Sequence, residues 1–98
     1  MWVKTHHSYR DVIAVCDSEL VGKTFEEGNK QIRISEYFFK GEEKTPEQVE
    51  EILKNGVIED TTFVLVGNQA IQTALNLEVI QKNSVTTIQE IPVALILL

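Results

Sequence analysis

The stretch that decides the fold is TTFVLVGNQAIQTAL, residues 61–75 of a 98-residue chain. Its first six residues are apolar or β-branched, which is typical of a buried strand, and Gly67-Asn68 marks the turn that follows. The next apolar residues fall on one face of a helix over residues 69–77: Ala70, Ile71, Ala74 and Leu75. With the β-branched run at residues 85–88, the pattern predicts a βαβ unit with a parallel strand pair, and Asn68 as the cap of its helix.

A second helix is predicted over residues 45–55. Thr45 is a residue type that favours the N-cap, and Pro46 suits the first helical position. The apolar residues Val49, Ile52 and Leu53 recur at the i, i+3, i+4 spacing of one buried stripe. Asn55-Gly56 predicts the C-terminal end of this helix.

The N-terminal residues predict a β-hairpin. Residues 2–6 alternate, with Trp2, Lys4 and His6 on one face, and residues 12–16 form a short apolar run. The polar residues 7–11 between the two runs are expected to form the turn.

The remaining segments are less regular. Residues 17–29 predict an ordered loop with a helical turn. Residues 31–35 alternate as in a strand, and Tyr37-Phe38-Phe39 either continues this strand or starts the next one. Residues 93–98, after Pro92, are expected to be a final strand or a hydrophobic tail. The chain is therefore predicted to be one domain, residues 1–98, of the α+β (α/β-like) class. This domain has a small mixed sheet, an N-terminal hairpin, a C-terminal βαβ unit and two main helices.

Composition restricts the class of protein. The net charge of −6 argues against non-specific coating of nucleic acid, although it leaves room for a local basic patch. No apolar run approaches the ~20 residues of a membrane helix, and the N-terminus does not resemble a signal peptide. The single cysteine, Cys16, allows no intrachain disulfide, which suits a reducing compartment. We expect a cytoplasmic protein with no membrane partner.

Candidate nucleic-acid-binding residues begin in the N-terminal hairpin. Residues 1–10 carry two cations and no carboxylate. Aromatic rings and Arg stack on bases, and cations pair with phosphate. The alternative interpretation is an ordinary solvated turn. The candidate set, which includes cations from the next loop, is Lys4, His7, Tyr9, Arg10, Lys23 and Lys30.

The loop after the second predicted strand is a candidate ligand-binding loop. Its polar residues and hinge are Asp17, Glu19, Gly22 and Lys23. Polar groups on a glycine-containing loop after a buried strand are often placed for binding. The alternative is a loop whose glycines satisfy special backbone angles while its apolar side chains fill the core.

His6, His7 and Cys16 are the residues that strand pairing could bring together as metal ligands or as a Cys–His nucleophile pair. No CxxC or HxxxH motif completes a tetrahedral set. Cys16 shares a predicted strand face with Val12 and Ala14, which favours a buried structural thiol. We therefore predict no metal, no cofactor and no catalytic residue.

Five motifs span nearly the whole chain: HSYR (7–10), VCDSELVGKTFEEG (15–28), YFFKGE (37–42), VGNQA (66–70) and Ile91-Pro92. Together they resemble an archaeal family known only as domain of unknown function 424. The resemblance implies a setting in translation or RNA handling, with residues 7–10 and 17–28 as the segments that carry it. The chain departs from the family pattern at Asn68, where members often have Glu, and at Val93, where they often have His.

The leading prediction is a non-enzymatic binding module whose partner is RNA or a ribosome-associated protein. The alternative is a protein-interaction or dimerisation adaptor that uses the acidic segment 41–60 or forms a homodimer through the C-terminal strand. A small-molecule or metal-dependent enzyme ranks third, and it would use His6, His7, Cys16 and Asp17.

Overall fold

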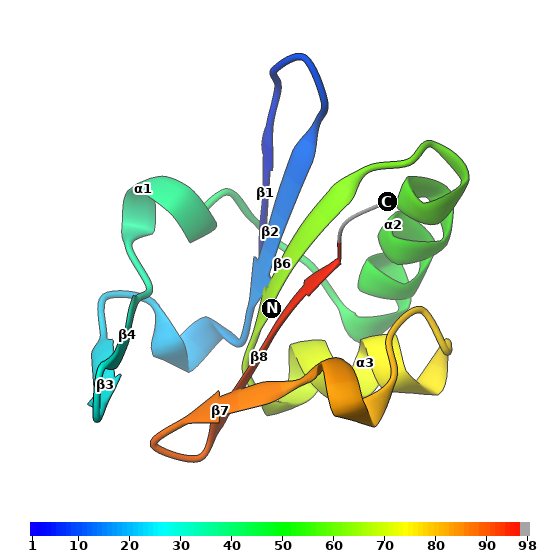
Figure 1. The fold of residues 1–98 in the computed structure, drawn as a ribbon. Helices are drawn as coiled ribbons and strands as arrows, with labels where there is room; N and C mark the ends of the chain where they lie inside the picture. Colours follow the sequence, from blue (N-terminus) through cyan, green and yellow to red (C-terminus); the bar gives the residue numbers. More distant parts are fainter. Residues whose placement is uncertain (97–98) are drawn as a thin grey trace.

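The computed structural model describes residues 1–96. Within them, eight strands form a six-stranded sheet of order β5-β1-β2-β6-β8-β7 and a separate β3–β4 hairpin (Figure 1). The strands are β1 (Trp2–His6), β2 (Val12–Cys16), β3 (Thr24–Glu27), β4 (Lys30–Arg33), β5 (Glu42–Glu43), β6 (Thr62–Val66), β7 (Thr86–Ile88) and β8 (Ile91–Ile96). The helices are α1 (Glu36–Phe39), α2 (Pro46–Ile58) and α3 (Asn68–Asn76), with 3₁₀ turns η1 (Ser18–Leu20) and η2 (Lys82–Ser84).

The α+β fold class and the N-terminal hairpin are confirmed. β1 pairs antiparallel with β2, with Trp2 opposite Cys16 and His6 opposite Val12. β2 runs parallel to β6, and β6 runs antiparallel to β8, so the sheet is mixed. None of the described helices is long and apolar enough to cross a bilayer.

The βαβ unit is present, but its two strands are not hydrogen-bonded neighbours. β8 lies between β6 and β7, and the parallel partner of β6 is β2. The reason is a two-residue turn at Gln89 and Glu90, with φ of 51° and 67°. Positive φ at both positions is the signature of a tight hairpin that returns the chain beside β7. Neither Gln nor Glu is typical of such a turn, so the sequence did not predict it. The expected hydrogen-bonded parallel pair within residues 61–88 is therefore wrong.

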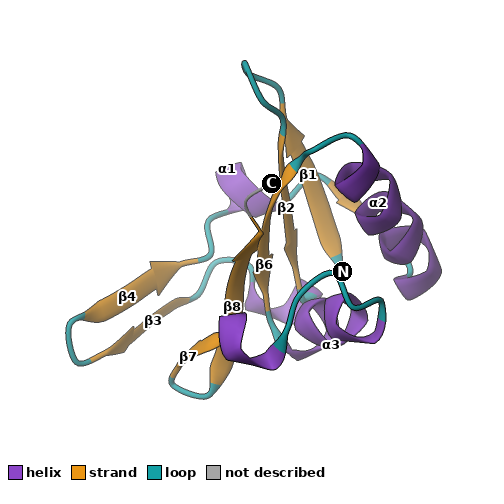
Figure 2. Cartoon of the chain, turned by 45° about the vertical axis from the view of Figure 1, so that its right-hand side comes forward, coloured by secondary structure: helices purple, strands orange, loops and turns teal. Residues whose placement is uncertain are grey.

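The sheet separates two layers of different thickness. α2 and α3 cover one face, and α1 with the β3–β4 hairpin lies on the other (Figure 2). Successive side chains of a strand point to opposite faces of the sheet, so each strand contributes to both layers. Val3 is buried on the α2–α3 side, whereas Trp2 packs on the α1 side. The larger core, on the α2–α3 side, includes the fully buried side chains of Val15, Phe63 and Leu65.

α2 begins as predicted and ends one turn later. Thr45 and Gln48 form a capping box in which each side chain accepts from the other's backbone N–H, at 3.2 and 2.9 Å. The helix continues through Gly56 to Ile58, so the expected stop at Asn55-Gly56 is wrong. Gly56 is required for packing instead, because a Cβ atom there would lie 2.1 Å from the Phe63 ring.

Two segments between the hairpin and α2 differ from expectation. Part of the predicted loop 17–29 forms β3, which pairs with β4 around Gly28 (φ 62°). The Tyr37-Phe38-Phe39 run is helical rather than extended. Ser35 caps this short helix α1 by accepting from the Phe38 backbone N–H at 3.1 Å.

Replacing Gly56 with Ala tests this close packing. Although Ala favours a helix, we expect Gly56→Ala to lower the free energy of unfolding by about 1–3 kcal/mol, because the methyl group displaces Phe63. Urea denaturation measures the change. Asn55→Ala, at an exposed position of the same helix, is the control and should not destabilise. If both variants are equally stable, the contact between α2 and β6 is not tight.

Candidate functional site

Three residues of β1 point toward α1 and form a surface with it. Trp2, Lys4 and His6 alternate with the buried Val3 along the strand. Each contacts a residue of the segment that contains α1, and we call this surface the β1–α1 strip. Its members are Trp2, Lys4, His6, Tyr37, Phe38 and Lys40.

The β1–α1 strip consists of three stacked pairs. The Lys40 Nζ atom lies 5.4 Å from the Trp2 ring centroid, and Lys4 Nζ lies 4.7 Å from that of Tyr37. The His6 and Phe38 rings stack with centroids 4.5 Å apart and planes 20° apart. Two cation–ring pairs and one ring–ring pair therefore lie in a row along β1.

Hydrogen bonds to the backbone hold two of these pairs. Lys4 Nζ donates to the Tyr37 carbonyl oxygen at 2.5 Å. His6 Nε2 lies 2.8 Å from the Phe38 carbonyl oxygen, and because a carbonyl only accepts, this nitrogen carries the proton. Tyr37 itself is 79% exposed, so its ring remains accessible.

The hairpin tip beyond β1 carries further candidates. Tyr9 is fully exposed, and the Ser8 hydroxyl donates to the Arg10 carbonyl at 2.6 Å, which shapes the turn. His7 pairs instead with Asp11, with Nδ1 and Oδ1 3.3 Å apart. His7 also lines a cleft of about 700 Å³ between the hairpin and the C-terminal half of α2. This cleft lies on the α2 side of the sheet.

The predicted nucleic-acid residues thus separate into groups. Lys4 lies in the β1–α1 strip, with Tyr9 and Arg10 at the hairpin tip beyond it. Lys23 and Lys30 lie at the β3–β4 hairpin, which is distant from that tip in both views (Figures 1 and 2). Residues 37–40 were not among the predicted site residues, because a strand was expected at residues 37–39. The available signal was Ser35, a typical N-cap residue three positions before Phe38.

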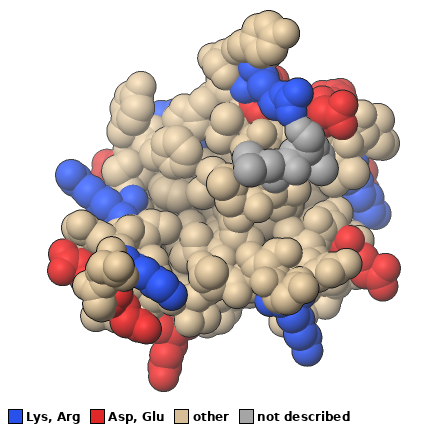
Figure 3. Space-filling view, viewed as in Figure 1, with Lys and Arg blue, Asp and Glu red and all other residues tan. Residues whose placement is uncertain are grey.

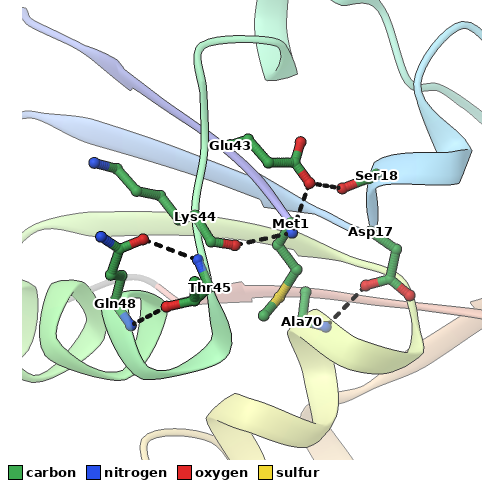
Figure 4. Close-up of polar contacts among 8 residues, drawn as sticks. All are labelled: Met1, Asp17, Ser18, Glu43, Lys44, Thr45, Gln48 and Ala70. Carbon is green, nitrogen blue, oxygen red and sulfur yellow. Dashed lines mark hydrogen bonds and ion pairs between the residues drawn. The ribbon is translucent and has the colours of Figure 1, made fainter.

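Asp17 of the predicted ligand loop has a structural role. Its two carboxylate oxygens accept from the Gln69 and Ala70 backbone N–H groups at 3.0 and 2.9 Å. Figure 4 shows the bond to Ala70. The residue is 3% exposed and caps α3 from across the fold. Asn68 was therefore wrongly expected as the cap, since Gly67 occupies that position without a capping side chain.

The other members of that loop remain at the surface. Glu19 and Lys23 are exposed, and Gly22 adopts a φ of 90° while its N–H donates to the Ile34 carbonyl at 2.7 Å. A binding role for these three residues stays a prediction.

The Cys–His alternative is wrong. The strand register places Cys16 opposite Trp2, at the end of the hairpin away from His6. Cys16 is fully buried, and burial, followed by the charge of Asp17, raises the pKa of its thiol to about 12. A thiol of this kind is a poor nucleophile at neutral pH. Within residues 1–96, no three His, Cys, Asp or Glu side chains gather as a metal-ligand group.

A polar network holds the start of β1 (Figure 4). The terminal ammonium of Met1 donates to the Lys44 carbonyl at 3.1 Å and lies 3.4 Å from the Glu43 carboxylate. The Ser18 hydroxyl donates to the same Glu43 oxygen at 2.5 Å. The Ser18 hydrogen bond, reinforced by the Met1 ammonium, lowers the pKa of Glu43.

Comparison with known proteins gives one family and one solved structure. A family model described as "Protein of unknown function (DUF424)" matches residues 5–98. The chain is similar to an uncharacterised conserved protein from Methanopyrus kandleri, with a TM-score of 0.78 and 19% identity over 98% of this chain and 90% of that one. At this identity, the likeness establishes the fold alone. No curated protein matches the chain.

The Asp17 cap predicts a specific loss of stability. Asp17→Ala leaves one buried and one partly buried N–H group of α3 without their acceptor, so we expect the free energy of unfolding to fall by about 2–3 kcal/mol. Urea denaturation measures the loss, and amide exchange should locate it in the first turn of α3. Glu19→Ala, on the exposed neighbour, should change stability by less than about 0.5 kcal/mol. Equal stability of the two variants would contradict the capping role.

The lowered pKa of Glu43 predicts a pH dependence. A carboxylate whose pKa is depressed on folding stabilises the fold above its unfolded pKa, near 4.5, and loses that contribution as pH falls through the folded pKa. The stability difference between the wild type and Glu43→Gln should therefore be largest near neutral pH and disappear in acid. Ser18→Ala should reduce the same difference, since it removes the main cause of the shift. A difference that grows on acidification would refute this assignment.

Proposed function

The chain belongs to the DUF424 family, and because the family's description assigns no activity, we propose a function from the surface of the chain itself. The protein is a non-enzymatic module that binds single-stranded RNA in the RNA-handling or translation apparatus of the cytoplasm. The β1–α1 strip and the hairpin tip, Tyr9 and Arg10, form its binding surface.

The observation that carries the proposal is the row of two cation–ring pairs and one ring–ring pair along β1. Single-stranded nucleic acid is bound by aromatic rings that stack on bases and by cations that follow the backbone. The strip offers the exposed ring of Tyr37 beside Lys4, with Lys40 and Trp2 next along the strand. A five-residue strand spans about 16 Å, which is long enough for a few stacked nucleotides.

The charge distribution supports the same surface in an otherwise acidic chain. Residues 1–40 carry six Lys and Arg and six Asp and Glu, and one of these acids, Asp17, is buried in the α3 cap. Residues 41–98 carry three and nine, so the whole net charge of −6 arises there. Three of those nine acids, Glu47, Glu50 and Glu51, lie on α2, which covers the opposite face of the sheet (Figure 2). The sheet itself separates the carboxylates of α2 from the strip. Glu42 and Glu43, in contrast, pair beside the start of β1, and Glu59 and Asp60 lie near Tyr9 and Arg10.

The adaptor function ranks second because the C-terminal strand offers little free edge. β8 pairs with β6 on one side and with β7 on the other over residues 91–93. Among the described residues of this strand, 94–96 pair with β6 alone and 91–92 pair with β7 alone, and residues 97–98 lie outside the described part. A homodimer through this edge would therefore rest on a short ladder.

RNA binding should depend on salt and on two named side chains. If Lys4, Lys40 and Arg10 each neutralise one phosphate, the slope of log K against log salt for a ~10-nucleotide RNA should be about −2. Tyr37→Ala should weaken binding about tenfold, since base stacking contributes ~1–3 kcal/mol. Arg10→Ala should make the slope shallower by about 0.7. Fluorescence anisotropy measures both effects.

Lys54→Ala is the matched control, because Lys54 is an exposed cation of α2 on the opposite face. It should leave affinity and slope unchanged. Binding that ignores Tyr37→Ala and Arg10→Ala but responds to Lys54→Ala would place the site elsewhere. A cross-linked pull-down from cytosol with and without ribonuclease tests the cellular role, and a partner that survives the nuclease would favour the adaptor function.

A further inference from the structure

The cleft of about 700 Å³ on the α2 side of the sheet takes no part in the RNA-binding surface. It lies between the β1–β2 hairpin and the C-terminal half of α2 (Figure 2), and the half-buried side chains of Ile13 and Ile52 line it. A second cavity, of about 540 Å³, lies at the hairpin tip. Three residues line both cavities, and we call them the junction residues: Asp11, Glu59 and Thr61. An apolar cleft with a few convergent polar groups is the usual form of a small-ligand site.

The strand register brings two of the junction residues side by side. β2 and β6 are parallel, and the Thr62 N–H donates to the Asp11 carbonyl at 3.1 Å. Asp11 and Thr61 are therefore neighbours one position before the ladder begins. Thr61 lies on the same face of β6 as the buried Phe63, which is the face that α2 covers. The Thr61 N–H donates to the Gly56 carbonyl at 2.8 Å, which holds this corner of the sheet against the end of α2.

The side chain of Thr61 is the observation that points to a ligand. The residue is only 5% exposed, yet its hydroxyl has no hydrogen-bond partner among the residues that the structure describes. Every fully buried side-chain nitrogen or oxygen in residues 1–96 has a partner, so this hydroxyl must reach the small surface that Thr61 exposes. That surface borders the two cavities. A nearly buried polar group without a partner is costly, and a ligand that bonds it removes the cost.

The charges at the junction select a cation. Asp11 and Glu59 are carboxylates, and His7 Nδ1 pairs with only one Asp11 oxygen, Oδ1. α2 ends at this point without a basic residue in its last turn, so the negative end of its dipole is not neutralised from within the helix. Figure 3 shows acidic side chains gathered at the upper right, where α2 ends beside the hairpin. An anionic ligand would be repelled here.

The neighbouring cations do not fill this position. The Lys44 Nζ atom lies 3.5 Å from the Glu42 carboxylate at the rim of the cleft. Lys4 lines the cleft, but its ammonium donates to the Tyr37 carbonyl on the α1 side of the sheet. Arg10 lines the second cavity and not the first. The first cavity therefore presents carboxylates to a ligand together with the Thr61 hydroxyl.

A primary ammonium group matches these acceptors better than a metal ion does. It has three N–H donors, and the junction residues offer a hydroxyl and two carboxylates. Within residues 1–96, no three His, Cys, Asp or Glu side chains are placed to hold a metal ion. The apolar lining, Ile13 and Ile52, suits an aliphatic chain attached to the ammonium.

We propose that the cleft binds a primary ammonium group on an aliphatic chain. The ammonium lies at the junction residues, and the chain lies along Ile13 and Ile52. A small aliphatic amine and the Lys side chain of a peptide both present this chemistry. The site is on the α2 side of the sheet, so it does not depend on the RNA-binding function.

Titration of the full chain with pentylamine, followed by amide chemical shifts, tests the proposal. The amides of Ile13, Asn55 and Thr61, which line the cleft, should shift and saturate, whereas the uncharged pentan-1-ol should not move them. Asp11→Asn should weaken binding about tenfold, since it removes a hydrogen bond between charged groups. Thr61→Val should also weaken it about tenfold without lowering the free energy of unfolding, because the lost hydroxyl has no partner in the unliganded protein.

Glu47→Gln is the matched control, because it removes an exposed carboxylate from the other end of α2 and should leave the affinity unchanged. The proposal is overturned if Glu47→Gln weakens binding as much as Asp11→Asn, which would show only a general attraction of cations to an acidic chain. It is also overturned if Thr61→Val binds pentylamine as well as the wild type does, or if pentan-1-ol binds equally well.

A parallel titration with Nα-acetyl-lysine N-methylamide separates the two sources of the ammonium group. Tighter binding of this compound than of pentylamine assigns the cleft to a Lys side chain of a partner. Weaker binding assigns it to a free amine.

Discussion

The cap that Asp17 places on α3 is the interaction on which the rest of the structure depends. The residue directly follows β2, and its carboxylate accepts from N–H groups in the first turn of a helix that begins more than fifty positions later. The parallel pair β2–β6 brings these two points together, and Asp17 N–H donates to the Val66 carbonyl at 3.1 Å. Gly67 is the residue that allows it, because a Cβ there would lie 2.4 Å from the Asp17 carboxyl carbon. One carboxylate thus fixes the centre of the sheet and the start of its neighbouring helix.

From this centre the two faces of the sheet diverge. Helices cover the α2–α3 side and pack tightly on it. Gly56 allows α2 to lie directly against the Phe63 ring. The other side carries only α1, η1 and a hairpin, so the strands there meet solvent in part. A protein this small could cover the face with one more helix. The β1–α1 strip and this partly solvated face therefore lie on one side of the sheet, and α2 lies on the other.

The neighbouring surfaces differ in chemistry in a way that the backbone explains. β1 lies under α1, where rings from a helical turn stack on its side chains. On β6 and β8, farther from that turn, Val66 is buried, Val64 and Val93 are half-buried and Leu95 is exposed. A helix of four residues ends where it does because the chain must return to pair Glu42 and Glu43 with the start of β1. The Met1 ammonium, Glu43 and Ser18 hold that return in place.

The sequence by itself determined the elements whose signals are local. Strand alternation in residues 2–6, the apolar runs of β2 and β6, and the Thr45-Pro46 start of α2 are all encoded within a few neighbouring residues, and each is present. It also placed Lys4 correctly beside His6 on one strand face. Tertiary structure alone decided what those elements meet. The local sequence predicts that Asp17 is a loop carboxylate, but the parallel pairing of β2 and β6 brings it to Gln69 and Ala70. The local sequence also predicts that Gly56 ends a helix, but in the fold it lies against Phe63 within the helix. Contacts between residues far apart in the chain leave no local pattern, because each partner is specified only by the fold that brings them together.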